Sequence, residues 1–227
     1  LKKIVANALN ISKDLIAQIE PFGGMTNKNF KITVNTGDQY VLRIPGNGTE
    51  KFINRKHEKK NSMIGSQLGI NANLIYFDEN TGLKISTLIP NAETLTPQTT
   101  KWEKNLRRIT DILKKLHTSG IQMDNDFNVS EMIVHYESLV KEARAEMYPN
   151  YEWLRENVIK LKEMYESMHI TLAPCHNDLV PENFVKSGED KIYLIDWEYS
   201  GMNDPVWDLS ALSLESSFSG KDDELLL

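Results

Sequence analysis

The spacing of the apolar residues changes near residue 96. Before it they alternate with polar residues in short runs, and after it they recur at helical intervals. Residues 29–35 alternate as a half-buried strand does, residues 36–38 (Thr-Gly-Asp) are typical of a turn, and residues 40–44 suit a return strand. The first part of the chain is therefore predicted to contain a β-hairpin.

Other segments extend this predicted sheet. Residues 74–77 and 83–88 have the composition of strands and are joined by a turn sequence. Residues 14–22 fit a helix or a strand on pattern alone, and they would be a fifth strand if extended. Residues 1–9 are a candidate amphipathic helix, and a further helix is predicted over roughly residues 51–68.

Helical periodicity dominates from Thr96 onward. Pro97 suits the first turn of a helix, and Gly120 is a residue at which a helix stops. The apolar residues between them recur three or four positions apart and predict a core-facing stripe, made by Trp102, Leu106, Ile109, Leu113 and Leu116. Further helices are predicted over residues 130–147, 151–168 and about 206–216.

The composition indicates a globular protein without an extended charged surface. Of the 227 residues, 40% are hydrophobic and 26% are charged, and the formal net charge is -6, with both signs mixed along the chain. These values suit one compact unit or two small lobes. They argue against an extended surface for nucleic acid or for anionic membranes.

Two features bear on location. No apolar run approaches the ~20 residues of a membrane span, and polar residues between positions 7 and 14 interrupt any signal-peptide core. Cys175 is the only cysteine, so an intrachain disulfide is excluded and a reducing compartment is favoured. We expect a cytoplasmic protein with no integral membrane association and no nucleic-acid partner.

The densest candidate chemistry lies in residues 175–208. Asp178 and Asn183 occupy a loop that follows an apolar segment, and Asp196 closes the apolar run 192–195. A hairpin between them would bring the three side chains together. Any one of them alone is most often a turn former. Together they suit phosphoryl transfer, because an Asp can orient and deprotonate a hydroxyl while Asn and Asp oxygens hold Mg²⁺.

This ordered set resembles the choline/ethanolamine kinases, which are related to the aminoglycoside phosphotransferases and have a protein-kinase-like fold. His176, Asp178 and Asn183 match the family's His-x-Asp-x-x-x-x-Asn loop. Residues 196–199 (Asp-Trp-Glu-Tyr) match the segment that replaces Asp-Phe-Gly of protein kinases. With residues 23–27 (Gly-Gly-Met-Thr-Asn), Arg43 and Glu58, the resemblance covers nearly the whole chain and is closest to small bacterial choline kinases.

The resemblance implies an α+β, bilobal protein-kinase-like fold with an antiparallel-sheet N-terminal lobe and a mainly helical C-terminal lobe. Residues 1–89 would form the nucleotide-binding lobe and residues 90–227 the catalytic and substrate lobe. It also favours a strand over residues 14–22. Because family members continue with further helices, we expect the chain, which starts at Leu1 and stops at apolar residues 225–227, to be cut at both ends.

ATP and Mg²⁺ are the cofactors that the resemblance implies. Asn183 and Asp196 would hold the metal. Arg43 would grip phosphate oxygens and pair with Glu58, because a planar guanidinium can bind two oxygens at once. The other implied nucleotide-binding residues are the phosphate-loop residues Gly23, Gly24, Thr26 and Asn27 and the hinge residues Ser86 and Leu88. From the residues alone, Gly-Gly is more often a simple turn, and the run around Glu58 is more often a solvated face.

The implied substrate is choline, with Asp178 accepting the proton of its hydroxyl. Candidate contacts of the choline cation are Trp197, Glu198, Tyr199, Trp207 and Glu215, because aromatic faces and carboxylates suit a quaternary ammonium. Lone aromatic residues are usually core, and Glu215 is as readily an exposed helix position. The alternatives are a kinase of ethanolamine, thiamine or an aminoglycoside, or an inactive module that binds choline or nucleotide. Asp208 is expected to cap a helix and to tie down the backbone of the catalytic loop.

Overall fold

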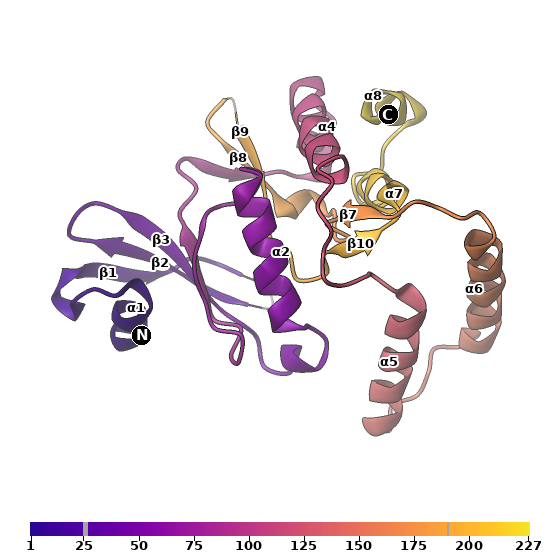
Figure 1. Ribbon diagram of the computed structural model, residues 1–227, viewed down its shortest axis with the longest axis horizontal. Coiled ribbons are helices and arrows are strands. Elements are labelled where there is room, and N and C mark those ends of the chain that lie inside the picture. Colours follow the sequence, from indigo (N-terminus) through magenta and orange to yellow (C-terminus); the bar gives the residue numbers. More distant parts are fainter. Residues whose placement is uncertain (25–26, 190) are drawn as a thin grey trace.

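The computed structural model describes residues 1–24, 27–189 and 191–227, which form a sheet-containing N-terminal lobe and a mainly helical C-terminal lobe (Figure 1). The N-terminal elements are α1 (Lys2–Leu9), β1 (Ile16–Pro21), β2 (Lys28–Val34), β3 (Gln39–Ile44), α2 (Arg55–Gln67), β4 (Leu74–Phe77) and β5 (Lys84–Thr87). The five strands pair antiparallel in the order β1-β2-β3-β5-β4. This confirms the predicted hairpin and the strand within residues 14–22.

The N-terminal lobe has its own apolar core. The alternation along β2 buries Ile32 and Val34, and α1 covers them with Val5 and Ala6. Leu42 of β3 and Ile85 of β5 complete the cluster from neighbouring strands. Because period-2 alternation sends these side chains to one face, the opposite face of the strands is left for polar and ligand contacts.

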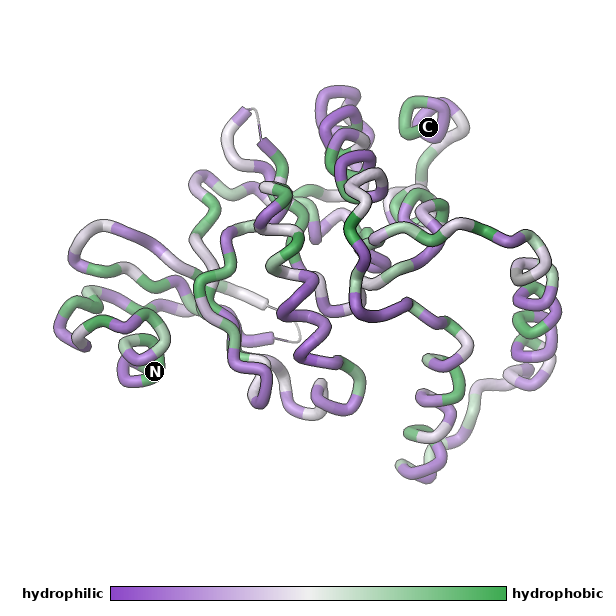
Figure 2. The backbone as a smooth tube through the Cα atoms, viewed as in Figure 1, coloured by the Kyte–Doolittle hydropathy of each residue, from purple (hydrophilic) through white to green (hydrophobic). Residues whose placement is uncertain are grey.

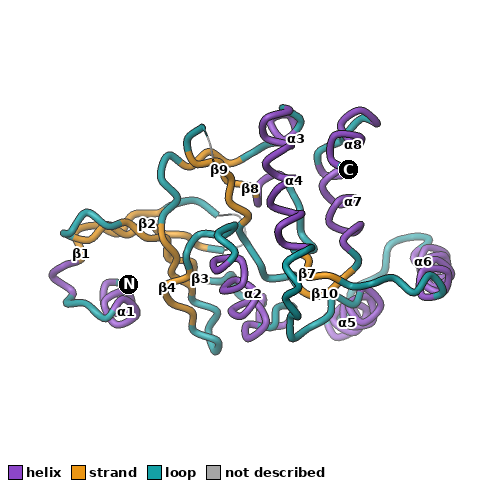
Figure 3. Tube along the Cα trace, turned by 45° about the horizontal axis from the view of Figure 1, so that its top comes forward, coloured by secondary structure: helices purple, strands orange, loops and turns teal. Residues whose placement is uncertain are grey.

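The C-terminal lobe contains most of the helices. Its elements are β6 (Ala92–Thr94), α3 (Pro97–Thr100), α4 (Glu103–His117), α5 (Val129–Glu142), α6 (Tyr151–Glu166), β7 (Ala173–Cys175), β8 (Phe184–Ser187), β9 (Lys191–Leu194), β10 (Gly201–Asn203), α7 (Pro205–Glu215) and α8 (Gly220–Leu226). Two small sheets, β6-β8-β9 and β10-β7, lie beside α4 and α7 (Figure 3). Helices α5 and α6 lie at one edge of this body (Figure 1), and α5 contacts the segment before α2 through the rings of Phe52 and Tyr136.

The main core lies under α4. Leu106, Ile109, Leu113 and Leu116 are buried, as the stripe predicted, and the chain around α4 alternates between hydrophobic and hydrophilic residues (Figure 2). The prediction for Trp102 was wrong. Its extended backbone makes it the N-cap of α4 and separates α3 from α4, and the side chain is 58% exposed. Strand β6 was not predicted.

The terminal leucines find a partner within the lobe. Leu226 of α8 is buried in the cluster that contains Leu106 and Leu116, while Leu227 is exposed. Helix α8 begins with a capping box in which Ser219 and Asp222 satisfy each other's backbone donors. In the described part of the chain, we find no helix that combines the length and apolarity needed to cross a membrane.

Gly65 is where α2 meets the C-terminal lobe, and it predicts a stability effect. A Cβ at this position would lie 2.5 Å from Cζ2 of Trp197, which is fully buried. Gly65→Ala is expected to destabilise the fold by about 1–3 kcal/mol through overpacking, against a helix-propensity gain of up to about 1 kcal/mol. Urea unfolding measures the difference.

Gly220→Ala is the matched control for this change. A Cβ at Gly220 meets nothing within 4 Å, and Gly220 is also a helical residue, at the start of α8. Alanine there should be neutral or slightly stabilising. Equal unfolding midpoints for the two variants would show that the contact between α2 and Trp197 tolerates a methyl group.

Candidate active site

A cavity of about 370 Å³ lies between the two lobes. Four of the predicted nucleotide-binding residues line it, namely Asn27, Arg43, Ser86 and Leu88, and so does Asp196. Gly23, Gly24 and Glu58 are not among the described residues that line the cavity. Thr26 lies outside the described residues.

The predicted phosphate loop has one position that only glycine suits. Gly24 has φ +113°, and a Cβ there would lie 2.1 Å from the backbone oxygen of Asn27. The Oδ1 atom of Asn27 accepts a hydrogen bond from the backbone N–H of Gly46 at 3.3 Å. The side chain of Asn27 is thereby tied to the turn that follows β3. This contact therefore fixes a side chain that lines the cavity.

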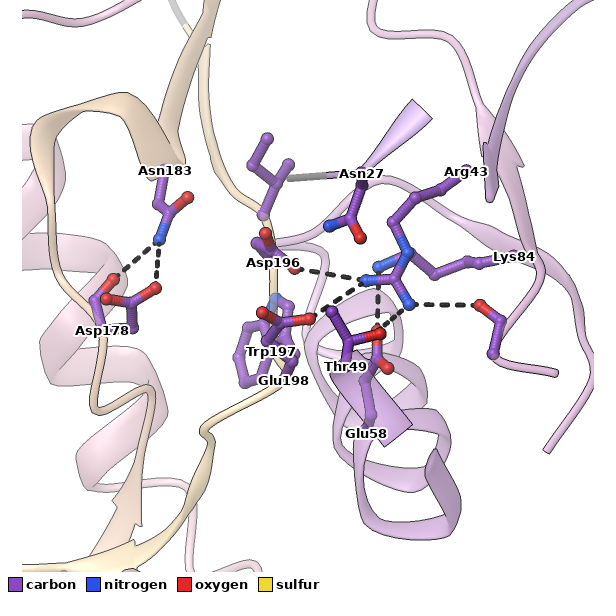
Figure 4. A network of polar contacts seen from close by, with 12 residues as sticks. Asn27, Arg43, Thr49, Glu58, Lys84, Asp178, Asn183, Asp196, Trp197 and Glu198 are labelled. Atoms are coloured by element: carbon purple, nitrogen blue, oxygen red, sulfur yellow. Dashed lines mark hydrogen bonds and ion pairs between the residues drawn. The ribbon is translucent and has the colours of Figure 1, made fainter. Parts of the chain in front are cut away.

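Arg43 and Glu58 form an ion pair behind this cavity (Figure 4). The Nη2 atom of Arg43 lies 2.5 Å from Oε1 of Glu58, and its Nη1 atom lies 3.3 Å from Oδ1 of Asp196. The strand β3 carries Arg43, and the first turn of α2 carries Glu58. The ion pair is the one that the resemblance implied, and Glu58 has no exposed surface, so the alternative of a solvated face does not hold for it. Its part in nucleotide binding stays a prediction.

Sequence reasoning missed two cations of this network. Arg55 contacts Oε2 of Glu58 at 2.6 Å, and Lys84 contacts Oε1 at 3.4 Å. Burial alone would raise the pKa of Glu58, but Lys84, Arg43 and Arg55 together lower it. The spacing of Arg55 and Glu58, three residues apart on a helix, was an available signal. Lys84, inside a predicted strand, carried no such signal.

Glu198 adds a half-buried carboxylate to the network. Its Oε2 atom lies 3.7 Å from Nη1 of Arg43 and 3.6 Å from Nη1 of Arg55. Burial and then the charge of Asp196 raise the pKa of Glu198 to about 7, with the two arginines opposing the rise. Oε2 of Glu198 is buried and has no hydrogen-bond partner among the described residues, because both arginine contacts are longer than a hydrogen bond.

Asp178 and Asn183 are joined within the catalytic loop. The Nδ2 atom of Asn183 donates to the backbone oxygen of Asp178 at 2.8 Å and to Oδ2 of Asp178 at 3.0 Å. Asn183 ends a short 3₁₀ turn (Pro181–Asn183), and its backbone oxygen accepts a hydrogen bond from Ile195 N–H at 2.9 Å. The hairpin of β8 and β9 thus brings Asp196 to the loop that carries Asp178, as predicted.

Burial raises the pKa of Asp178, and the charges of Asp196 and Glu215 act in the same direction. His176 and the hydrogen bond from Asn183 oppose the rise. A carboxylate in this position is less well solvated than one at the surface, which favours its acting as an acceptor for the proton of a bound hydroxyl.

Asp208 holds the backbone at the start of the catalytic loop. Its Oδ2 atom accepts from His176 N–H at 2.9 Å, and its Oδ1 atom accepts from Asn177 N–H at 2.7 Å. Nε2 of His117 lies 2.9 Å from Oδ2, so His117 also serves this anchor from the end of α4. Nε2 of His176 lies 2.9 Å from the backbone oxygen of Ile195. Because burial lowers its pKa, His176 is a neutral brace. The tie from Asp208 to the loop backbone is the one expected, but the expected helix cap was wrong, because Asp204 is the N-cap of α7.

The oxygen donors fit a hard divalent cation. Asn183 uses its amide nitrogen toward Asp178, which leaves Oδ1 available, and the Asp196 side chain is 32% exposed at the cavity. Oxygen ligands of this kind are those that Mg²⁺ prefers. Carboxylate oxygens of Glu58, Asp196 and Glu198 also lie within 4.8 Å of one another. Glu58, however, is already committed to its three cations.

The predicted substrate residues are placed differently from one another. Trp197 has no exposed surface, and its ring packs edge-on against His176 at 5.1 Å. It is a core residue, so the structure contradicts its predicted contact with substrate. Trp207 is 39% exposed and donates from Nε1 to the backbone oxygen of Asn177 at 3.3 Å. Glu215 is exposed on α7.

Tyr199 borders two shallower cavities of about 240 and 460 Å³, which it shares with Glu198. Sequence reasoning missed their other aromatic walls, Phe52 and Tyr136, whose rings lie 5.6 Å apart. Burial, and next its contact with Tyr136, raise the pKa of Tyr199. The side chain of Tyr199 is therefore half-buried and neutral beside the catalytic loop.

Comparison with known proteins identifies the relatives of this arrangement. The family model for choline/ethanolamine kinase matches residues 18–224. Protein LicA of Haemophilus influenzae is 32% identical over 205 residues, which cover 90% of this chain and 60% of that protein. The chain thus spans less than two thirds of the length of this relative.

Solved structures agree with this match. Choline kinase LicA from Streptococcus pneumoniae superposes with a TM-score of 0.86 at 38% identity, covering 100% of this chain and 78% of that one. LicA in complex with AMP superposes with a TM-score of 0.85 at 38% identity, covering 99% of this chain and 78% of that one. The ADP-bound aminoglycoside phosphotransferase APH(2'')-Ib shares the fold alone. It is 14% identical, with a TM-score of 0.63, and the match covers 99% of this chain and 83% of that one. The bilobal protein-kinase-like fold is confirmed, and the chain belongs to the choline/ethanolamine kinase family.

Proposed function

We propose that this protein transfers the γ-phosphoryl group of ATP to the hydroxyl of choline, giving phosphocholine and ADP. The observation that carries the proposal is the convergence of Asp178, Asn183 and Asp196 beside the cavity between the lobes. A solved relative at 38% identity is a choline kinase, which favours choline as the acceptor. The AMP complex of LicA supports a nucleotide in the cavity.

The roles follow from the contacts. Asp178 orients the acceptor hydroxyl and takes its proton, because Asn183 fixes its carboxylate on the loop beside Asp196 (Figure 4). Asn183 and Asp196 would hold Mg²⁺, which offsets the negative charge of the phosphates. Arg43 holds phosphate oxygens, and Glu58 fixes its guanidinium. Positioning and charge stabilisation are what phosphoryl transfer needs from a protein.

Choline differs from ethanolamine in having no N–H to donate. A site for choline should therefore offer aromatic faces with carboxylates near them, whereas an ethanolamine site can place acceptors in direct contact. Tyr199 and Trp207, with Glu198 or Glu215 for charge balance, are the partly exposed candidates. This contrast yields a substrate-choice prediction.

Tyr199→Ala is expected to lower kcat/KM for choline by roughly tenfold or more while hardly changing ATP affinity, since one desolvated cation–π contact contributes up to about 2 kcal/mol. Choline and ethanolamine are measured side by side in both proteins. Tyr148→Ala, at a tyrosine that is 86% exposed, is the control. A wild type that prefers ethanolamine, or a variant that weakens ATP and choline equally, would rule out the choline site.

The decisive test of the function is a panel of acceptors. ADP release from ATP is followed with choline, ethanolamine, thiamine and an aminoglycoside, and the products are identified by mass spectrometry. Phosphocholine as the main product supports the proposal. Preference for another acceptor supports a different small-molecule kinase of this fold, and binding without turnover supports an inactive module. With the single cysteine favouring a reducing compartment, we place the reaction in the cytoplasm.

A further inference from the structure

We propose that Lys84 is a nucleotide-binding residue whose ammonium contacts the phosphates of ATP, beside Arg43. The resemblance to choline kinases predicts a phosphate contact for Arg43 and none for Lys84. Lys84 lies on a different strand, and no motif marks it. The inference rests on the proposed use of ATP, and it concerns which residues of the cavity recognise the phosphates.

Strand β5 places Lys84 at the phosphate end of the cavity. Lys84, Ser86 and Leu88 all line the cavity, and they are two residues apart, as residues on one face of a strand are. Leu88 belongs to the predicted hinge, at which the base would bind. Leu88 follows Lys84 by four positions, or roughly 13 Å along an extended chain. Lys84 pairs in register with Arg43, whose guanidinium reaches Asp196.

The ion pair with Glu58 does not require Lys84. Arg43 and Arg55 approach the two oxygens of Glu58 at 2.5 and 2.6 Å, whereas Lys84 is 3.4 Å from Oε1. Two arginines therefore neutralise and hydrogen-bond the carboxylate already. The other two carboxylates of the network, Asp196 and Glu198, contact the arginines. The ammonium of Lys84 is therefore left with its longer contact to Glu58 in the described part of the chain, and a further anion would offset the cost of burying it. A phosphate group is an anion of the required kind.

The donors of the two cations are used to different degrees. Nη1 of Arg43 faces Asp196 and Glu198, and its Nη2 atom faces Glu58 and the backbone oxygen of Gly82 at 3.2 Å. An ammonium has three donors. Within residues 1–24, 27–189 and 191–227, the ammonium of Lys84 makes one hydrogen bond, to Glu58. Lys84 thus keeps donors for a ligand, while Arg43 is largely engaged.

The electrostatic surroundings point the same way. Burial and then the charge of Arg43 lower the pKa of Lys84, with Glu58 and Asp196 opposing. Burial and Arg43 therefore disfavour the charged ammonium more than Glu58 and Asp196 stabilise it. Its side chain keeps 14% of its surface exposed, and it is open to the cavity rather than sealed in the core.

The experiment compares nucleotide binding with nucleoside binding. Calorimetric titrations of ATP with Mg²⁺, and of adenosine, are made on wild type, Lys84→Met and Lys84→Arg. Lys84→Met should bind ATP roughly tenfold or more weakly, because a hydrogen bond to a charged group is lost, and should bind adenosine as wild type does. Lys84→Arg should stay within a few-fold of wild type, because the charge is kept. Lys59→Met, at an outer lysine that pairs with Glu79, is the matched control and should bind both ligands normally.

Each other outcome has a distinct meaning. ATP binding by Lys84→Met at wild-type strength overturns the inference and leaves the proposed function intact. Equal losses of ATP and adenosine overturn it as well, because they show that Lys84 only supports the fold. If Lys84→Arg binds ATP as weakly as Lys84→Met does, the positive charge of Lys84 is not what binds the phosphates, and the inference is overturned. Absence of ATP binding by wild type would instead remove the proposed function itself.

Discussion

Asp178→Asn is expected to lower kcat by roughly 100-fold or more and to leave the affinity for Mg-ATP near that of wild type. The substitution keeps the shape of the side chain and removes the proton acceptor. The amide oxygen of the new side chain can still accept the hydrogen bond that Nδ2 of Asn183 donates at 3.0 Å. The loop should therefore keep its conformation, and the loss should be confined to turnover.

Steady-state kinetics with choline, together with titration of Mg-ATP, measure both parts of this prediction. Asp124→Asn provides the matched control, because Asp124 is a surface carboxylate that pairs with Lys60, outside the cavity. Its kcat should equal that of wild type. A purified Asp178→Asn protein with near-normal kcat would show that another group accepts the proton.

Asp196→Ala is expected to abolish Mg²⁺-dependent binding of nucleotide. Asn183, the other proposed ligand, has no charge with which to replace the missing carboxylate. The change also frees Nη1 of Arg43 from its contact with Asp196 at 3.3 Å. ATP binding that remains in the variant should therefore be independent of the metal, because it rests on the cations of the N-terminal lobe.

Calorimetric titrations of ATP, one with Mg²⁺ and one with excess EDTA, separate metal-dependent from metal-independent binding. Asp196→Asn keeps an oxygen and the side-chain shape, so it should show an intermediate metal dependence. Glu93→Ala, an exposed carboxylate on β6, should bind Mg-ATP like wild type. If Asp196→Ala keeps both the affinity and the metal dependence, the metal lies elsewhere, and Glu198 would be the first residue to test.

Local signals predicted most of the fold. Alternating residues and turn residues act over a few positions, which is why the hairpin of β2 and β3 could be predicted from residues 29–44. The break between α3 and α4 could not. Apolar spacing continues through Trp102, and only the extended backbone at that residue shows that a helix begins after it. Strand β6 was missed because its partner β8 lies far away in sequence.

In the candidate site, too, the features set by local sequence could be predicted, and those set by tertiary packing could not. The order of Asp178, Asn183 and Asp196 predicted their convergence, because a single hairpin connects them. The surroundings of Glu58 depend on β3, β5 and α2 packing together, and a run of charged residues in the sequence is usually a solvated face. The burial of Trp197 was likewise invisible, since its motif is the same for a core and a substrate role.

The single thiol has a practical consequence. Cys175 is fully buried at the end of β7, its Sγ lies 3.6 Å from the backbone oxygen of Asn203, and burial followed by the charge of Asp208 raises its pKa. Alkylating reagents attack the thiolate, so they must wait until β7 and β10 separate. Because this chain has no other cysteine, the rate of thiol labelling measures how often the segment that leads into the catalytic loop opens locally.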